Sequence, residues 1–134
     1  MRSRSRLLVI ALVAFALIGI GASSAFAAPA TYVGYLMDVA CGASGKALDG
    51  SDPVNAPWDH TKMCLVACKA SGFGVSLKVG DSYKFFKFDR SGSDAALAQI
   101  VNKTKRDKEI VVAVEGTLKD GVITVTSVRE ANLL

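Results

Sequence analysis

Two predicted β-hairpins, each with a glycine and an aspartate at its turn, constrain the fold of this 134-residue chain more than any other feature. Segments of β-branched and aromatic residues flank Gly80-Asp81 and Asp120-Gly121, and such dipeptides are typical of tight hairpin turns. A similar segment around Gly34 predicts one more strand near the N-terminus. The five predicted strands cover residues 31–38, 73–79, 82–88, 109–118 and 122–128.

Two short helices are predicted among these strands. Apolar residues recur at helical spacing over residues 94–103, with Ser93 as a candidate N-cap, and over residues 59–70, with Asp59 as a candidate N-cap. Residues 40–58 are rich in Gly, Ser, Asp, Asn and Pro, so we expect a loop there. A helix between the third and fourth of five strands is the order of an OB-type β-barrel, and we therefore expect a mainly β domain of this fold. An open α+β sheet with two helices packed on it is the alternative.

The N-terminus has the three zones of a secretory signal peptide. Arg2, Arg4 and Arg6 precede an apolar run, and Ala25-Phe26-Ala27 has the small residues of a cleavage site. The run is shorter than the roughly 20 residues that cross a bilayer. We therefore expect residues 1–27 to be removed, leaving one exported OB-like domain of residues 28–134, periplasmic or extracellular, without a membrane span.

Removal of this leader changes the charge of the chain. The full sequence has 16 Lys and Arg residues and 12 Asp and Glu residues. Because three of the arginines belong to the leader, 13 basic residues then face 12 acidic ones. A nearly neutral domain has no general attraction to polyphosphate, so nucleic acid is not an expected partner.

All three cysteines and the only histidine lie in a predicted insert at about residues 39–71. Exported thiols meet an oxidising environment, in which a disulfide is the first interpretation. Cys41 follows the first predicted strand, while Cys64 and Cys68 lie in the predicted helix. A bridge from Cys41 to either would pin the insert to the barrel, would contribute about 3 kcal/mol, and would leave one thiol unpaired.

A soft-metal site is the alternative interpretation. Cys41, His60, Cys64 and Cys68 offer three sulfur atoms and one imidazole nitrogen, the tetrahedral set that zinc or copper(I) accepts. The last three would follow one side of the predicted helix, at intervals of four residues. Asp38 is interpreted as a turn residue. A redox dithiol of Cys64 and Cys68 is a third interpretation, although redox dithiols generally have a two-residue spacer.

Aromatic residues indicate where a ligand would bind. In the strand at residues 82–88, Tyr83 and Phe85 alternate with Phe86 and Phe88, so the two pairs face opposite sides. Tyr83, Phe85 and Phe73 form the predicted ligand face, and no catalytic residue is predicted. We expect a non-enzymatic binding module for a partner protein or small ligand, with a disulfide-pinned insert. A metal-binding protein that uses the cysteine and histidine cluster, with zinc or copper as its cofactor, is the alternative.

Four motifs of the predicted mature domain carry a resemblance. They are Gly34-Tyr35-Leu36-Met37-Asp38 with Cys41, His60-Thr61-Lys62 with Cys64 and Cys68, Ser71-Gly72-Phe73-Gly74-Val75, and Glu115-Gly116-Thr117-Leu118. In these motifs the chain is similar to a group of small exported bacterial proteins of unassigned function. The resemblance spans nearly the whole mature domain and implies an OB-like secreted fold, but no activity, substrate or cofactor. It also implies a variable spacing of the last two cysteines, which favours a bridge over a strict metal geometry.

Overall fold

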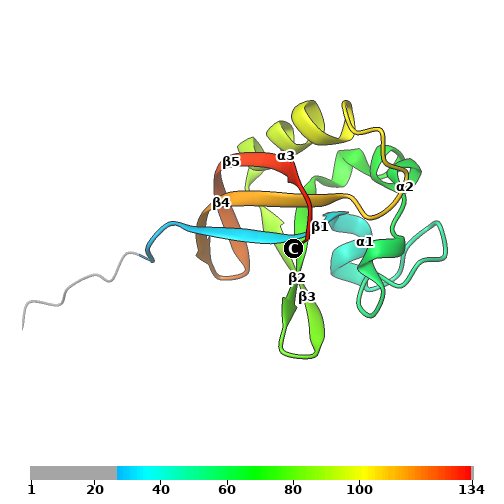
Figure 1. The fold of residues 1–134 in the computed structure, drawn as a ribbon, viewed down its shortest axis with the longest axis horizontal. Coiled ribbons are helices and arrows are strands. Elements are labelled where there is room, and N and C mark those ends of the chain that lie inside the picture. Colours follow the sequence, from blue (N-terminus) through cyan, green and yellow to red (C-terminus); the bar gives the residue numbers. More distant parts are fainter. Residues whose placement is uncertain (1–26, 134) are drawn as a thin grey trace, which may run out of the picture.

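The computed structural model describes residues 27–133, in which five strands form a closed ring of hydrogen bonds (Figure 1). The order around the ring is β1, β2, β3, β5 and β4, and β4 pairs again with β1. All neighbours are antiparallel except β3 and β5, which are parallel. The predicted signal peptide lies outside the described residues apart from Ala27. The strands are Ala30–Asp38 (β1), Phe73–Val79 (β2), Ser82–Phe88 (β3), Val111–Lys119 (β4) and Val122–Ala131 (β5).

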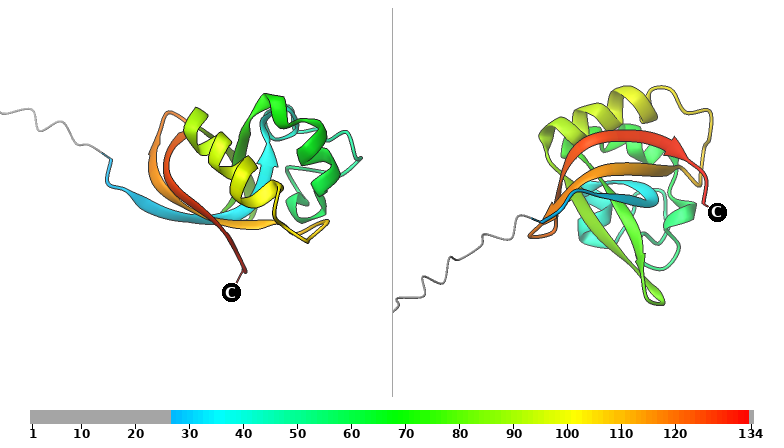
Figure 2. Two further views of the ribbon diagram at one scale, coloured as in Figure 1. Left: turned by 90° about the horizontal axis from the view of Figure 1, so that it is seen from above. Right: turned by 60° about the vertical axis from the view of Figure 1, so that its left-hand side comes forward.

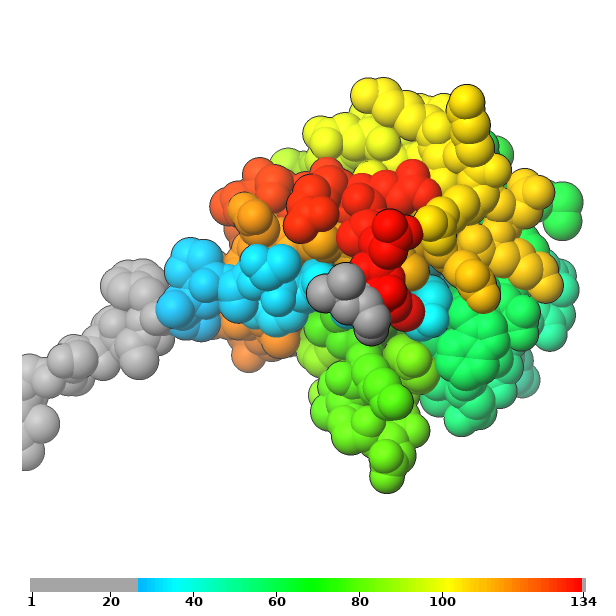
Figure 3. Space-filling view, in the orientation of Figure 1, coloured from blue at the N-terminus to red at the C-terminus, as the bar shows by residue number. Residues whose placement is uncertain are grey.

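Both predicted hairpins are confirmed. Strands β2 and β3 have the predicted bounds, and their hairpin projects from the body of the molecule, coloured light green in Figure 3. Between β4 and β5, Asp120 and Gly121 have φ angles of 52° and 79°. A two-residue turn with two positive φ angles matches the twist of the strands, and Asp and Gly tolerate this conformation better than most residues. The turn residues therefore favour this hairpin locally.

The described residues form three short helices, one more than predicted. Helix α1 (Val39–Ser44) lies in the stretch that was expected to be a loop. Asp38 caps it by accepting a hydrogen bond from the Cys41 N–H (2.9 Å), and Gly45, with a φ of 69°, ends it. Six residues are too few to show apolar periodicity, so the two caps are the main sequence signal for this helix.

Helix α2 (Lys62–Ala67) begins later than predicted, because its N-cap is Thr61. The predicted cap, Asp59, belongs to a separate 3₁₀ turn. His60 therefore precedes the helix, and the prediction that it begins a helical stripe is wrong. A second 3₁₀ turn, Lys69–Ser71, leads from α2 towards β2.

Helix α3 (Arg90–Ala96) begins earlier than predicted, because Asp89 caps it. Ser93, the predicted cap, instead accepts a hydrogen bond from the Phe73 N–H (3.0 Å) and so links α3 to β2. The chain continues through a π-helical turn, Leu97–Val101. None of the helices within residues 27–133 is long and apolar enough to cross a membrane.

The hydrophobic core fills the interior of the strand ring. Helix α3 packs against β5, β2 and β3, and α2 contributes Leu65, which is fully buried. Phe86 and Phe88 face the core, as the alternation in β3 predicts. The buried core residues are Leu36, Leu65, Phe73, Val75, Phe86, Phe88, Ala96, Ile100, Val101, Ile110, Val112, Val114, Ile123 and Val128.

The insert covers the outer face of β1, β2 and β3 (Figures 1 and 2). Tyr35, Ser76 and Phe85 are cross-strand neighbours whose side chains share this outer face, because their chain neighbours Leu36, Val75 and Phe86 face the core. Tyr35 and Ser76 are nevertheless buried. Helix α1 makes contact with all three strands at this face. The insert therefore buries Tyr35 and Ser76 on the face of the sheet that points away from the core.

Candidate metal centre

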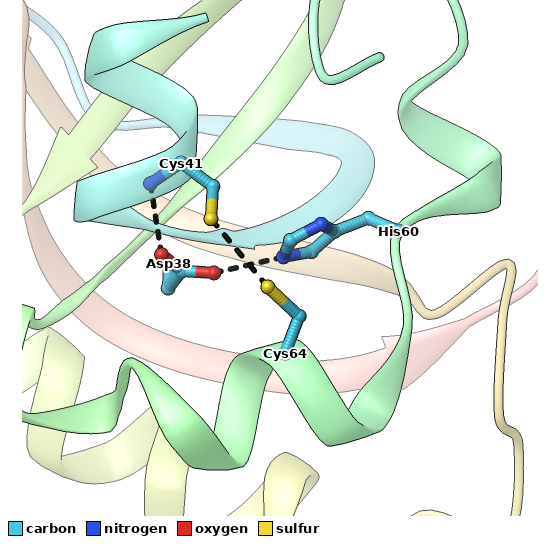
Figure 4. Close-up of side chains that lie close together, drawn as sticks. All are labelled: Asp38, Cys41, His60 and Cys64. Carbon is cyan, nitrogen blue, oxygen red and sulfur yellow. Dashed lines mark hydrogen bonds and ion pairs between the residues drawn. The ribbon is translucent and has the colours of Figure 1, made fainter. Parts of the chain in front are cut away.

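Four side chains meet where the insert joins the strand ring (Figure 4). Asp38 ends β1, Cys41 lies in α1, His60 precedes α2, and Cys64 lies in α2. One potential ligand atom from each lies within 4.8 Å of the other three. Exposure of these residues is 0%, 1%, 2% and 2%, respectively. The cluster therefore joins the strand ring, both helices of the insert and the segment between them at a point shielded from water.

Asp38 uses its two carboxylate oxygens for different tasks. Its Oδ1 accepts the hydrogen bond from the Cys41 backbone that starts α1, and its Oδ2 lies 2.8 Å from His60 Nε2. The first bond fixes the direction of the carboxylate, so the second oxygen points into the cluster. Because the capping residue and Cys41 are three positions apart, the same local motif delivers an oxygen and a sulfur to one place.

His60 is held from both sides. The residues two positions before and after it are linked to the segment before β4 by two backbone hydrogen bonds. The Glu109 N–H donates to the Trp58 carbonyl (2.9 Å), and the Lys62 N–H donates to the Asp107 carbonyl (2.8 Å). These bonds position the residue before α2 begins. The imidazole can then present Nε2 to Asp38, while Nδ1 faces the other side of the ring.

A second buried carboxylate, Asp49, lies on the Nδ1 side of His60. Its Oδ2 is 3.6 Å from Nδ1, and the Ser51 hydroxyl is 3.3 Å from the same nitrogen. Asp49 also accepts hydrogen bonds from the backbone and the hydroxyl of Thr61 (2.9 and 2.7 Å). A carboxylate behind an imidazole orients the ring and increases its basicity, as in many metal sites.

The surroundings favour a charged Asp38 carboxylate and a neutral Cys41 thiol. Burial opposes ionisation of Asp38, but hydrogen bonds from His60 and Cys41 outweigh it and lower the pKa of the carboxyl. Burial, the nearby Cys64 sulfur and the Asp38 carboxylate raise the pKa of Cys41 far above its usual range. A thiolate is the reactive form of cysteine, so the surroundings do not prepare Cys41 as a nucleophile. A bound cation would reverse this preference by stabilising the thiolate.

The two sulfur atoms of Cys41 and Cys64 lie 3.5 Å apart. In a tetrahedral zinc site with Zn–S bonds of about 2.3 Å, two sulfur ligands lie about 3.8 Å apart. The corresponding nitrogen–oxygen separation is about 3.3 Å, somewhat longer than the present Nε2–Oδ2 distance. Small side-chain movements would thus turn the four donors into a tetrahedral S₂NO set, so the residues fit the metal.

The structure brings together three of the four predicted ligands, Cys41, His60 and Cys64. Cys68 caps the C-terminal end of α2, is partly exposed, and is not a member of the cluster. Asp38 takes the fourth place, although its position after a strand indicated only a turn. The available signal was Asp38 itself, since aspartate is a favoured N-cap. As an N-cap, it accepts a hydrogen bond from the backbone N–H three positions later, which here belongs to Cys41.

No disulfide is present among the described residues, and all three cysteines are free thiols. The separation of Cys41 and Cys64 exceeds the S–S bond length of about 2.05 Å. The pair is nevertheless one of the two that the predicted bridge from Cys41, to either Cys64 or Cys68, could join. The geometry thus places the predicted bridge and the predicted metal site at the same two sulfur atoms.

The predicted aromatic ligand face is not an open surface. Phe73 is 1% exposed and belongs to the hydrophobic core, so it cannot contribute to such a face. Phe85 packs beneath Gly42 of α1, where an added Cβ atom would lie 2.5 Å from its ring. Tyr83 packs edge-on against Tyr35 and Trp58, with ring centroids 5.8 and 5.9 Å away. The insert therefore occupies the place where a ligand was expected.

Comparison with protein-family models, curated proteins and solved structures gave no match, so the functional interpretation rests on the geometry of the cluster.

Proposed function

We propose that this chain is a soft-metal-binding protein, in which Asp38, Cys41, His60 and Cys64 hold one ion, with zinc best matched to all four donors. The observation that carries this proposal is the convergence of four buried donor atoms within 4.8 Å. Buried polar and ionisable groups are expensive unless they are paired or bind a metal. Asp38 and His60 pair with each other, and the sulfur atoms of Cys41 and Cys64 lie 3.5 Å apart beside them.

The charge balance of the cluster also supports a cation. Two thiolates and one carboxylate would carry three negative charges in a buried site, which a divalent ion reduces to one. Asp49 then remains as the partner of His60 Nδ1, the position of the outer carboxylate in a carboxylate–histidine–zinc arrangement. Metal binding would release the protons of the two thiols, and its apparent affinity would therefore increase with pH.

A metal at this place would pin the insert to the strand ring. We regard the ring as an OB-like barrel, because its five strands close on themselves and helix α3 lies between the third and fourth strands, the order along the chain on which that prediction is based. The export signal, if cleaved, would place this domain outside the cytoplasm, in accordance with the resemblance to small exported proteins. The metal would then stabilise the fold there, as a disulfide does in other small exported domains.

A disulfide-pinned binding module is the second candidate function, and one observation favours it. The sulfur atoms of Cys41 and Cys64 are 3.5 Å apart, so a modest adjustment of two side chains would bring them to bonding distance. Oxidation would remove two of the four metal ligands. The two candidates are thus mutually exclusive states of one pair of thiols.

Cobalt(II) substitution tests the metal site directly, because a tetrahedral cobalt ion with thiolate ligands has characteristic visible and near-ultraviolet absorption bands. We expect the reduced protein to bind one cobalt ion with both kinds of band, and zinc to displace it. Cys64→Ser should abolish the thiolate bands or strongly weaken binding, whereas the matched control Cys68→Ser should leave both unchanged. Absence of cobalt binding, or an equal loss in Cys68→Ser, would contradict the proposed ligand set.

A further inference from the structure

A small hollow in the surface borders one side of the buried cluster. The hollow has a volume of about 160 Å³ and is lined by Leu48, Asp49, Met63, Cys64 and Ala67. Its wall therefore contains one ligand of the cluster, Cys64, and the carboxylate that lies behind His60. The larger hollow, of about 560 Å³, lies between the Lys69–Ser71 turn and α3 and contains no member of the cluster.

Two apolar side chains that line the small hollow, Leu48 and Met63, are exposed and form its outer edge. Leu48 and Met63 are 81% and 72% exposed, more than the other exposed large apolar side chains of the described residues. Met63 directly precedes Cys64 in α2, and both line the same hollow. The thioether of methionine is a soft ligand that suits copper(I) and has little affinity for harder ions. An exposed and a buried sulfur-containing side chain are thus consecutive in the chain.

From this arrangement we propose that the hollow is the port through which metal reaches the cluster, and that Met63 is a capture ligand for a cuprous ion. This inference rests on the proposed metal site and names a cargo and a route for it. A cuprous ion arriving with an external ligand would first exchange that ligand for the Met63 thioether. It would then pass to the sulfur of Cys64 and to Cys41 beyond it.

The transfer involves ligand exchange without a change of oxidation state. Copper remains copper(I), the external ligand leaves to solvent, and each thiol that becomes a thiolate ligand releases one proton. Asp49 is the carboxylate in the wall of the hollow, and it favours the entry of a cation of either kind. Zinc would use the same route without help from the thioether, and it therefore serves as an internal reference for the role of Met63.

Loading kinetics test this proposal. Anaerobic, reduced protein would be mixed with copper(I) held by a coloured bicinchoninate chelator, and separately with zinc held by a fluorescent chelator. Met63→Leu keeps the apolar volume and removes the sulfur, and we expect it to slow copper(I) loading roughly tenfold while zinc loading and both equilibrium affinities stay unchanged. Ala67→Phe fills the hollow and should slow both ions.

Two further variants serve as controls. Val66→Leu changes a neighbouring exposed residue of α2 that does not line the hollow, and it should load both ions at the wild-type rate. Leu48→Met in the Met63→Leu background returns a thioether to the mouth and should restore fast copper(I) loading.

The outcomes separate the port from the metal site itself. Equal copper(I) rates for wild type and Met63→Leu, or an equal slowing of both ions, would overturn the role of Met63. Unchanged loading in Ala67→Phe would overturn the port. Failure of the reduced wild-type protein to bind either ion would overturn the proposed metal site, and with it the port.

Discussion

Substitution of Asp38 separates its two tasks, because asparagine keeps one of them and alanine keeps neither. In Asp38→Asn, the amide oxygen can still accept the capping bond from Cys41, since Asn and Asp are comparable N-caps. The bond to His60 loses its charge, and a charged hydrogen bond contributes about 1 kcal/mol more than a neutral one. We therefore expect metal-free Asp38→Asn to be about 1 kcal/mol less stable than wild type.

Asp38→Ala removes both interactions. Loss of the cap costs about 1 kcal/mol, and a buried His60 nitrogen without its partner costs about 1–3 kcal/mol. The expected loss of about 2–4 kcal/mol corresponds to a decrease in Tm of roughly 10–20 °C for a domain of this size. The ranking of the metal-free proteins is therefore wild type, Asp38→Asn, then Asp38→Ala.

Zinc should increase the difference in stability between wild type and Asp38→Asn. At a free zinc concentration of about 100 Kd, binding adds about 2.7 kcal/mol to the stability of the wild-type protein. Asp38→Asn lacks one of the four ligands and should gain much less at the same concentration. Thermal melts followed by circular dichroism, in reductant with and without zinc, measure both effects. An equal zinc-induced shift in wild type and Asp38→Asn would refute Asp38 as a ligand, and equal stability of the two metal-free variants would refute its role as cap.

Three further predictions concern the surroundings of the site. Gly42→Ala should lower the stability measured by urea unfolding by about 1–2 kcal/mol, because the added Cβ atom would lie 2.5 Å from the Phe85 ring and this loss exceeds the gain in helix propensity. In a Phe85→Leu background the loss should disappear, and its persistence would contradict the contact. Ser76→Ala should stabilise the protein by about 1 kcal/mol, because the Ser76 hydroxyl is the buried side-chain group without a hydrogen-bond partner in the described part of the chain, and a decrease would indicate a missed partner. Hydrogen bonds from Ser51 and Thr61 overcome burial and hold the pKa of Asp49 well below its usual value of about 3.9, so the contribution of Asp49 to stability is present above about pH 4 and is lost as the pH falls further. Asp49→Asn should therefore lower stability at neutral pH and weaken the decrease of stability at acidic pH. An unchanged decrease at acidic pH would contradict this account.

The hairpins could be predicted from the sequence because their determinants are local. Gly80-Asp81 and Asp120-Gly121 carry the turn chemistry, and alternation in the flanking segments indicates which residues share a face. For β3 this alternation also identified the core-facing pair, Phe86 and Phe88. It could not identify the side of Phe73, because both sides of β2 are buried, one by the core and the other by the insert.

The site could be predicted only in part, because its assembly depends on contacts between distant segments. Cys41, His60 and Cys64 attracted attention through their side-chain chemistry and proximity in sequence. The fourth donor, Asp38, resembles an ordinary turn residue until the helix that it caps is known. Cys68 was included because a helix from residue 59 would have aligned it with His60, whereas the true helix starts after that residue. A small error in a helix boundary thus changed the predicted ligand set.

The central claim is that Cys41 and Cys64 are metal ligands, and intact mass spectrometry of the protein produced from the full-length sequence tests it most directly. The same sample would be measured under native conditions and again after denaturation and alkylation of free thiols. The account predicts one bound metal ion in the native spectrum and three alkylated cysteines once that ion has been removed. A metal-free native mass with a single alkylated cysteine would show a disulfide and would contradict the claim.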